Sequence, residues 1–180
     1  MNRAHFYNPF IYIAGYKSLF WGLAGLFLTS YFAFTSGTHF NGILNISLAK
    51  DADFWIYLIE NVSQWIFLST FLFIAGLVLS KSKIRGIDIF GTTLFSRIPL
   101  IITPLIRAIP FFQSFAYQSP AMYLIIAIYG ISLIWSIVLF FNAYKVSSNL
   151  KKENLIISFV VCMILSETIT KLFLYFFYLK

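Results

Sequence analysis

Charged residues are scarce in this sequence: they make up 11% of its 180 residues, whereas hydrophobic residues make up 60%. A soluble domain is about 25% charged, so this chain has too few polar residues to cover a core in water. Lipid is therefore the expected solvent for most of its surface. The net charge of +7 does not point to nucleic acid, because the basic residues stand in short segments between apolar runs and form no basic face with interleaved aromatic residues.

Cysteine and catalytic motifs are also nearly absent. The single cysteine, Cys162, lies inside an apolar run, which excludes disulfide frameworks and thiolate metal sites within the chain and favours a buried, inert thiol. The two histidines, His5 and His39, belong to no zinc motif, and no nucleotide-binding or nucleophile-elbow pattern is present. Ser96 and Ser166 are interpreted as serines that bond to their own helix backbone. We therefore expect no enzyme activity, no metal and no cofactor.

Long apolar runs are what the sequence has in abundance. Five of them are long enough to cross roughly 30 Å of hydrocarbon at about 1.5 Å per residue, and none alternates with the period of two that barrel strands show. The sequence predicts an all-α fold, a single membrane domain over residues 1–180. Its five transmembrane helices are expected at about residues 10–34, 54–79, 87–110, 121–144 and 154–178.

The start of the first span has two interpretations. Asn8 and Pro9 are typical of a helix N-terminus, which places the first helix directly after them. Alternatively, residues 10–18 lie flat on the membrane before the chain turns inward.

The basic residues divide unequally between the two sides that five spans define. One side holds Arg3, Lys17, Lys81, Lys83, Arg85, Lys145, Lys151 and Lys152, and the other holds Lys50, Lys180 and Arg107. Cytoplasmic loops carry the excess of Lys and Arg, so the N-terminus is predicted in the cytoplasm and the C-terminus outside. The basic residues of the two short loops are also predicted to form a rim that meets anionic lipid headgroups: Lys81, Lys83, Arg85, Lys145, Lys151 and Lys152. The alternative is that these residues act only as a topology signal.

The most unusual stretch is residues 86–110, which carries Arg97 near its middle together with Pro99, Pro104 and Pro110. A charge at bilayer depth costs a few kcal/mol or more unless it is paired, and proline removes a helix hydrogen bond and kinks the helix. This span is therefore expected to be surrounded by the other four, with Arg97 directed at a partner inside the bundle. Its prolines are interpreted either as a hinge or as a static kink.

Four intramembrane charges form a candidate polar network. Counting along the spans places Arg97 and Glu167 near the midplane, and Glu60 and Lys171 about 7 to 10 Å toward the outer side. The matched depths and opposite signs predict two interhelical pairs, Arg97 with Glu167 and Glu60 with Lys171, although Glu167 and Lys171 are also i,i+4 neighbours on one helix. Arg107 is expected at the outer interface, extended toward water. Such charges either determine which helices touch or line a cavity for an ion, proton or small ligand.

The chain resembles the bacterial branch of the YIP family, the Ypt/Rab-GTPase-interacting membrane proteins. The resemblance rests on Asn8-Pro9-Phe10 before the first span, on the basic loop SKSKIR, on the third span GIDIFGTTLFSRIPLIITPL, and on the W-x-x-x-L-x-x-x-A-Y-K pattern at residues 135–145. It implies an integral membrane protein of five spans that has no enzyme activity and works by association with other membrane components. Eukaryotic relatives act in vesicle traffic with Rab GTPases. The bacterial branch implies the cytoplasmic (inner) membrane as the location.

Two functions remain open at this point. The first is a scaffold or accessory subunit whose partners are membrane lipids and other integral membrane proteins or a second copy of the chain. The second is a small transporter, channel or lipid-handling protein that uses a polar intramembrane cavity. A scaffold predicts a closed bundle with paired charges, and a transporter predicts a water-accessible cleft that reaches the midplane.

Overall fold

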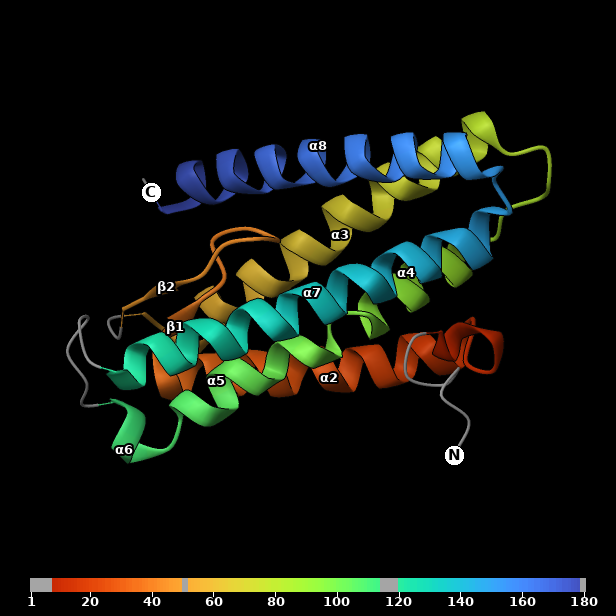
Figure 1. The fold of residues 1–180 in the computed structure, drawn as a ribbon. Helices are drawn as coiled ribbons and strands as arrows, with labels where there is room; N and C mark the ends of the chain where they lie inside the picture. Colours follow the sequence, from red (N-terminus) through yellow and green to blue (C-terminus); the bar gives the residue numbers. More distant parts are fainter. Residues whose placement is uncertain (1–7, 50–51, 114–119, 179–180) are drawn as a thin grey trace.

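The computed structural model describes residues 8–49, 52–113 and 120–178, and these residues form a bundle of long helices that lie side by side (Figure 1). Five segments are long and apolar enough to cross a membrane, as predicted, which indicates an integral membrane protein. They are α2 (Tyr16–Ser36), α3 (Phe54–Leu79), the segment Gly86–Arg107, α7 (Pro120–Ser148) and α8 (Lys152–Tyr178). The predicted bounds agree most closely for α3 and α8.

The chain enters the bundle through a short turn rather than through the first long helix. A 3-10 helix, η1 (Pro9–Ile11), follows Asn8, and α2 begins only at Tyr16 after Gly15, whose φ of 61° lies in the region that favours glycine. Phe10 is 1% exposed and its ring packs edge-on against Phe95 at 5.9 Å. The first span therefore starts later than the predicted residue 10, and residues 10–15 form a separate segment that rests on the bundle.

The third span is broken near its middle. Helix α4 (Gly86–Phe95) ends before Arg97, the 3-10 helix η2 (Ile98–Ile101) contains Pro99 at its start, and α5 (Ile102–Arg107) completes the crossing before the short α6 (Pro110–Gln113). Proline lacks the N–H that a helix interior needs, so the change to 3-10 geometry follows from the sequence. As predicted, this span is the most enclosed: 61% of its most apolar stretch is buried, against 28% to 39% for the other four.

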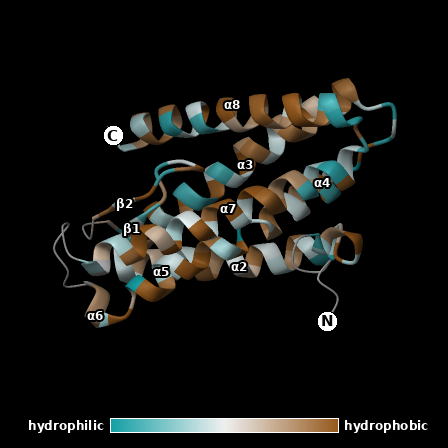
Figure 2. Cartoon of the chain, in the orientation of Figure 1, coloured by the Kyte–Doolittle hydropathy of each residue, from teal (hydrophilic) through white to brown (hydrophobic). Residues whose placement is uncertain are grey.

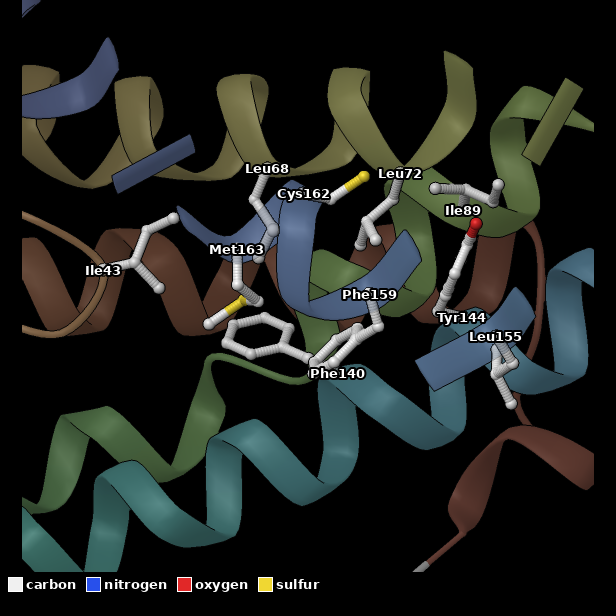
Figure 3. Close-up of a cluster of buried hydrophobic side chains, with 10 residues drawn as sticks. All are labelled: Ile43, Leu68, Leu72, Ile89, Phe140, Tyr144, Leu155, Phe159, Cys162 and Met163. Carbon is white, nitrogen blue, oxygen red and sulfur yellow. The ribbon is translucent and has the colours of Figure 1, made fainter. Parts of the chain in front are cut away.

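Apolar side chains from α3, α4, α7 and α8 form the main core, together with one residue from the segment that follows α2. Figure 3 shows this cluster, which comprises Ile43, Leu68, Leu72, Ile89, Phe140, Tyr144, Leu155, Phe159, Cys162 and Met163. Cys162 is buried as expected, and its thiol donates to the carbonyl of Phe71 at 3.4 Å. Glycines bring α2 against α4, because a Cβ at Gly22 would lie 2.8 Å from the backbone nitrogen of Phe95.

Hydrophobic residues predominate along the helices. Figure 2 shows this, with hydrophilic residues at helix ends, in bands within α3 and α8, and beside the strands β1 (Thr38–His39) and β2 (Ser47–Leu48). Helix α2 starts at the end of the bundle where α3 ends, and α8 finishes at the opposite end (Figure 1). The loop between α3 and α4 and the junction between α7 and α8 lie together at the end where α2 starts, which we call the basic end.

Candidate functional site

Residues 37–49 do not form an external loop but a hairpin that enters the bundle. The antiparallel pairs Thr38–Leu48 and His39–Ser47 hold its two arms together. Phe40, Gly42 and Ile43 between these pairs are buried, whereas Leu44 is exposed. Ile43 is 1% exposed and belongs to the same core cluster as Leu68 and Met163 (Figure 3). We call residues 37–49 the re-entrant hairpin. Irregular backbone at membrane depth is tolerated only where protein or a water-filled cavity surrounds it, so its polar groups need partners from the spans.

Glu60 of α3 supplies the first set of partners. Its carboxylate is fully buried and accepts hydrogen bonds from His39 Nδ1 at 2.6 Å, from the backbone N–H of Phe40 at 2.8 Å, and from the hydroxyl of Tyr178 at the end of α8. The His39 ring also stacks on Tyr57, with 4.3 Å between the ring centroids. Three hydrogen-bond donors stabilise the carboxylate and offset the cost of burying it. The predicted pair of Glu60 with Lys171 is therefore wrong, because the hairpin and Tyr178 occupy the carboxylate.

Arg97, at the break in the third span, lies inside the bundle as predicted and is 5% exposed. Its Nη2 donates to Asn61 Oδ1 at 3.0 Å and to Gln64 Oε1 at 2.8 Å, both on α3. Within the described residues no ion pair joins Arg97 to Glu167, so the predicted pair is wrong. The side-chain amides of Asn61 and Gln64 take the place of the predicted Glu167 carboxylate, because α3 lies closer than α8 to the interruption of the third span. The second terminal nitrogen, Nη1, is buried and has no hydrogen-bond partner in the described part of the chain.

The two sites form one connected network through the hairpin backbone. The N–H of Phe40 donates to Glu60, and the carbonyl of Phe40 accepts from Gln64, whose oxygen accepts from Arg97. Asn61 extends the network to α2, since its Nδ2 donates to Ser30 Oγ at 3.2 Å. A single chain of hydrogen bonds thus connects α8, α3, the hairpin, the broken span and α2.

Glu167 belongs to a separate contact on α8. Its carboxylate lies 2.8 Å from Lys171 Nζ on the same helix and accepts the backbone N–H of Leu44 at 3.1 Å. The alternative i,i+4 pair is therefore the one that forms. The hairpin approaches so closely that a Cβ on Gly42 would lie 2.8 Å from Glu167 Cδ, which explains a glycine at this position.

Arg107 lies at the end of the third span that was predicted to be the outer one, but its side chain is not extended toward water as predicted. It is 7% exposed, and its Nη2 donates to the carbonyl of Ser36 at 3.2 Å. Ser36 is the last residue of α2, where the helix dipole favours a cation. The guanidinium therefore joins the end of α5 to the end of α2.

The predicted lipid rim lies on exposed surface at the basic end. All six residues are exposed: Lys81, Lys83, Arg85, Lys145, Lys151 and Lys152. They differ in setting, however. Lys83 and Arg85 line a cavity of about 370 Å³ with Asp88 and Asn149, whereas Lys151 and Lys152 border a separate hollow with Glu153 and Asn154.

The two serines beside the intramembrane charges bond within their own helices. Ser96 and Ser166 donate to their own helices, to the carbonyls of Thr92 at 2.8 Å and Met163 at 3.0 Å, as interpreted from the sequence. Within residues 8–49, 52–113 and 120–178, no group of three or more His, Cys, Asp or Glu side chains is placed to hold a metal ion.

Comparison with family models, with curated proteins and with solved structures finds no match. The class of protein therefore rests on the fold alone, which is that of an integral membrane protein with five membrane-spanning segments.

Sequence reasoning missed the re-entrant hairpin, and with it His39 and Tyr178 as partners of Glu60. One signal was present: Glu60, Asn61 and Gln64 crowd one half of α3, and a membrane helix cannot satisfy three such side chains by itself. Their partners had to come from elsewhere in the chain. The backbone of a hairpin supplies both donors and acceptors without a charged side chain, so charge matching along the sequence did not reveal it.

Proposed function

We propose that this chain is a non-enzymatic integral membrane protein that works as a scaffold or accessory subunit, through association with other membrane components, as its resemblance to the YIP family implies. The observation that supports this proposal is that the buried charges find partners within the chain. Glu60 has three donors, Arg97 faces two amide oxygens, and Glu167 binds Lys171 and the hairpin. Charges used in this way determine which segments of the bundle touch.

The test is isolation of the protein from native membranes in polymer-bounded lipid discs, followed by cross-linking and mass spectrometry. A scaffold is expected to carry a stoichiometric membrane protein, or a second copy of itself, and to show no solute flux after reconstitution into liposomes. A chain that is isolated alone and conducts a solute would contradict the proposal.

The second candidate, a small transporter, channel or lipid-handling protein, is favoured by one observation. The third span is interrupted beside a buried guanidinium whose Nη1 has no hydrogen-bond partner in the described part of the chain. Transporters place substrate sites at interrupted helices near the midplane. Proteoliposomes loaded with a pH-sensitive dye or a labelled anion test this. Flux that disappears in Arg97→Gln, with the unfolding midpoint of the variant retained, would favour transport over the scaffold.

We further propose the bacterial cytoplasmic membrane as the location, with the N-terminus in the cytoplasm and the C-terminus outside. The support is that the loops carrying Lys83 and Lys151 lie at one end of the bundle, and cytoplasmic loops are rich in Lys and Arg. A periplasm-dependent reporter fused to the C-terminus is expected to be active, and the same reporter fused to the N-terminus is expected to be inactive. The reverse pattern would overturn the orientation.

A further inference from the structure

The cavity at the basic end has walls from three separate parts of the chain. The segment before α2 contributes Ala14, the α3–α4 loop and the first turns of α4 contribute Lys83, Arg85 and Asp88, and the end of α7 with the residue after it contributes Ser147 and Asn149. Its volume of about 370 Å³ is in the lower part of the range of small-molecule sites. The hollow at Lys151 and Lys152 differs, because it is lined by four consecutive residues at the start of α8.

The charges of the cavity favour an anion of limited charge. Lys83 and Arg85 are exposed cations, and Asp88 is a partly buried carboxylate whose Oδ2 lies 3.6 Å from Arg85 Nε. Within the described residues Lys83 forms no ion pair. Two cations and one carboxylate leave one net positive charge, which balances a singly charged group better than a doubly charged one.

The position of the cavity indicates where that anion comes from. Its lining lies in the α3–α4 loop, in the first turns of α4 and at the end of α7, where the spans leave the hydrocarbon and meet the headgroup layer. A phospholipid headgroup is joined through a phosphodiester, which carries a single negative charge. Hydroxyl and amide groups of Ser147 and Asn149 add donors for its oxygens.

We infer that this cavity is a binding site for the phosphodiester of a phospholipid headgroup, with Lys83 and Arg85 as the residues that hold the phosphate. Asp88 limits the positive charge and faces the part of the headgroup beyond the phosphate, so an ammonium-bearing headgroup is accepted as well as a neutral one. The site requires only the membrane placement of the bundle. It is independent of the scaffold role, since purified protein without partners is sufficient to test it.

The test is native mass spectrometry of the purified full-length protein titrated with phosphatidylglycerol. Lys83→Gln combined with Arg85→Gln is expected to weaken lipid binding about 30-fold, because each exposed ion pair made directly with the bound phosphate contributes up to about a factor of five. The matched control, Lys151→Gln combined with Lys152→Gln, removes the same charge from the other hollow and is expected to change binding less than twofold. Lys83 and Arg85 are exposed, so both double variants are expected to fold.

Three results would overturn the inference. Equal losses in the two double variants would indicate diffuse attraction to the basic end rather than a site. No loss in the Lys83/Arg85 variant would exclude these residues. The same titration is carried out with two soluble anions, glycerophosphoglycerol, which is the headgroup alone, and inorganic phosphate. If either binds with an affinity equal to that of the lipid, the cavity is a site for a soluble anion. The inference expects both to bind at least tenfold more weakly than the lipid.

Discussion

The two halves of the bundle are held together by different kinds of contact. Toward the basic end, α3, α4, α7 and α8 meet through apolar side chains such as Leu72, Ile89 and Phe159. Toward the other end, the re-entrant hairpin stands among the helices and hydrogen bonds join it to α3 and α8. In lipid, apolar packing can be replaced by contact with acyl chains, whereas a lost polar partner leaves a group unsatisfied in a medium that offers no replacement. The polar half should therefore be the more sensitive to single substitutions.

The largest effect is expected at Glu60. Glu60→Leu leaves His39, the N–H of Phe40 and the hydroxyl of Tyr178 without their acceptor, and breaking such a buried charged site costs about 3 to 5 kcal/mol. The free energy of unfolding, measured by tryptophan fluorescence during SDS titration in bicelles, checks this. The control is Glu153→Leu in the exposed first turn of α8, where a change below about 1 kcal/mol is expected. A similar small loss in both variants would remove the proposed difference between the halves.

The partner of Arg97 can be identified by double-mutant cycles. Arg97→Met and Gln64→Leu are expected to couple by about 1 to 3 kcal/mol, because the two side chains share a 2.8 Å hydrogen bond. The cycle of Arg97→Met with Glu167→Leu should give a clearly smaller coupling energy in the same unfolding assay. A larger coupling to Glu167 than to Gln64 would restore the pair that charge matching predicts.

Two glycines compare a tightly packed position in the apolar half with an open position on α7. A Cβ at Gly91 of α4 would lie 2.8 Å from the carbonyl oxygen of Gly15, a backbone atom that cannot rotate away, so Gly91→Ala should destabilise by about 1 to 3 kcal/mol. Gly130 of α7 has nothing within 4 Å of the same position, and Gly130→Ala should be neutral or stabilising by up to about 1 kcal/mol. Equal unfolding midpoints for the two variants would show that close approach of α2 and α4 is not required.

The smallest effect is expected at Lys171. Its side chain is 50% exposed, but to lipid rather than to water. Lys171→Gln keeps an amide donor for Glu167, which also accepts the N–H of Leu44, so the variant should cost about 1 to 2 kcal/mol. Thermal unfolding in detergent checks this value. A loss comparable to that of Glu60→Leu would mean that Lys171 is enclosed in the membrane, for example by another chain.

The sequence was sufficient to predict the spans because each apolar run is long and its ends are marked by polar residues. It also predicted the enclosure of the third span, since Arg97 and its prolines are unfavourable against lipid. The pairing of charges could not be predicted, because equal depth does not fix which helices are neighbours. Asn61 and Gln64 lie closer to Arg97 than Glu167 does and accept its hydrogen bonds. Depth in the membrane does not distinguish an amide acceptor from a carboxylate.

The hairpin was beyond sequence reasoning for a different reason. Residues 37–49 contain glycine, asparagine and few long apolar stretches, a composition typical of exposed loops. Their burial depends on Glu60, Gln64 and Glu167, which lie on two helices far apart in the sequence. No pattern within residues 37–49 indicates that their partners lie on these two helices.

The broken third span has a consequence for the order in which the protein is synthesised. Arg97 is an unfavourable residue to release into lipid, yet both of its acceptors, Asn61 and Gln64, belong to the span that leaves the ribosome just before it. Arg97 can therefore form its hydrogen bonds to α3 as soon as the third span has been inserted, before α8 is made. The hairpin is made before α3 and the third span. The contacts of α8 are the last to form, when Glu167 reaches Leu44 of the hairpin and Tyr178 reaches Glu60 of α3. Each costly group thus finds its partner already in place, so the chain can assemble in the order in which it is made.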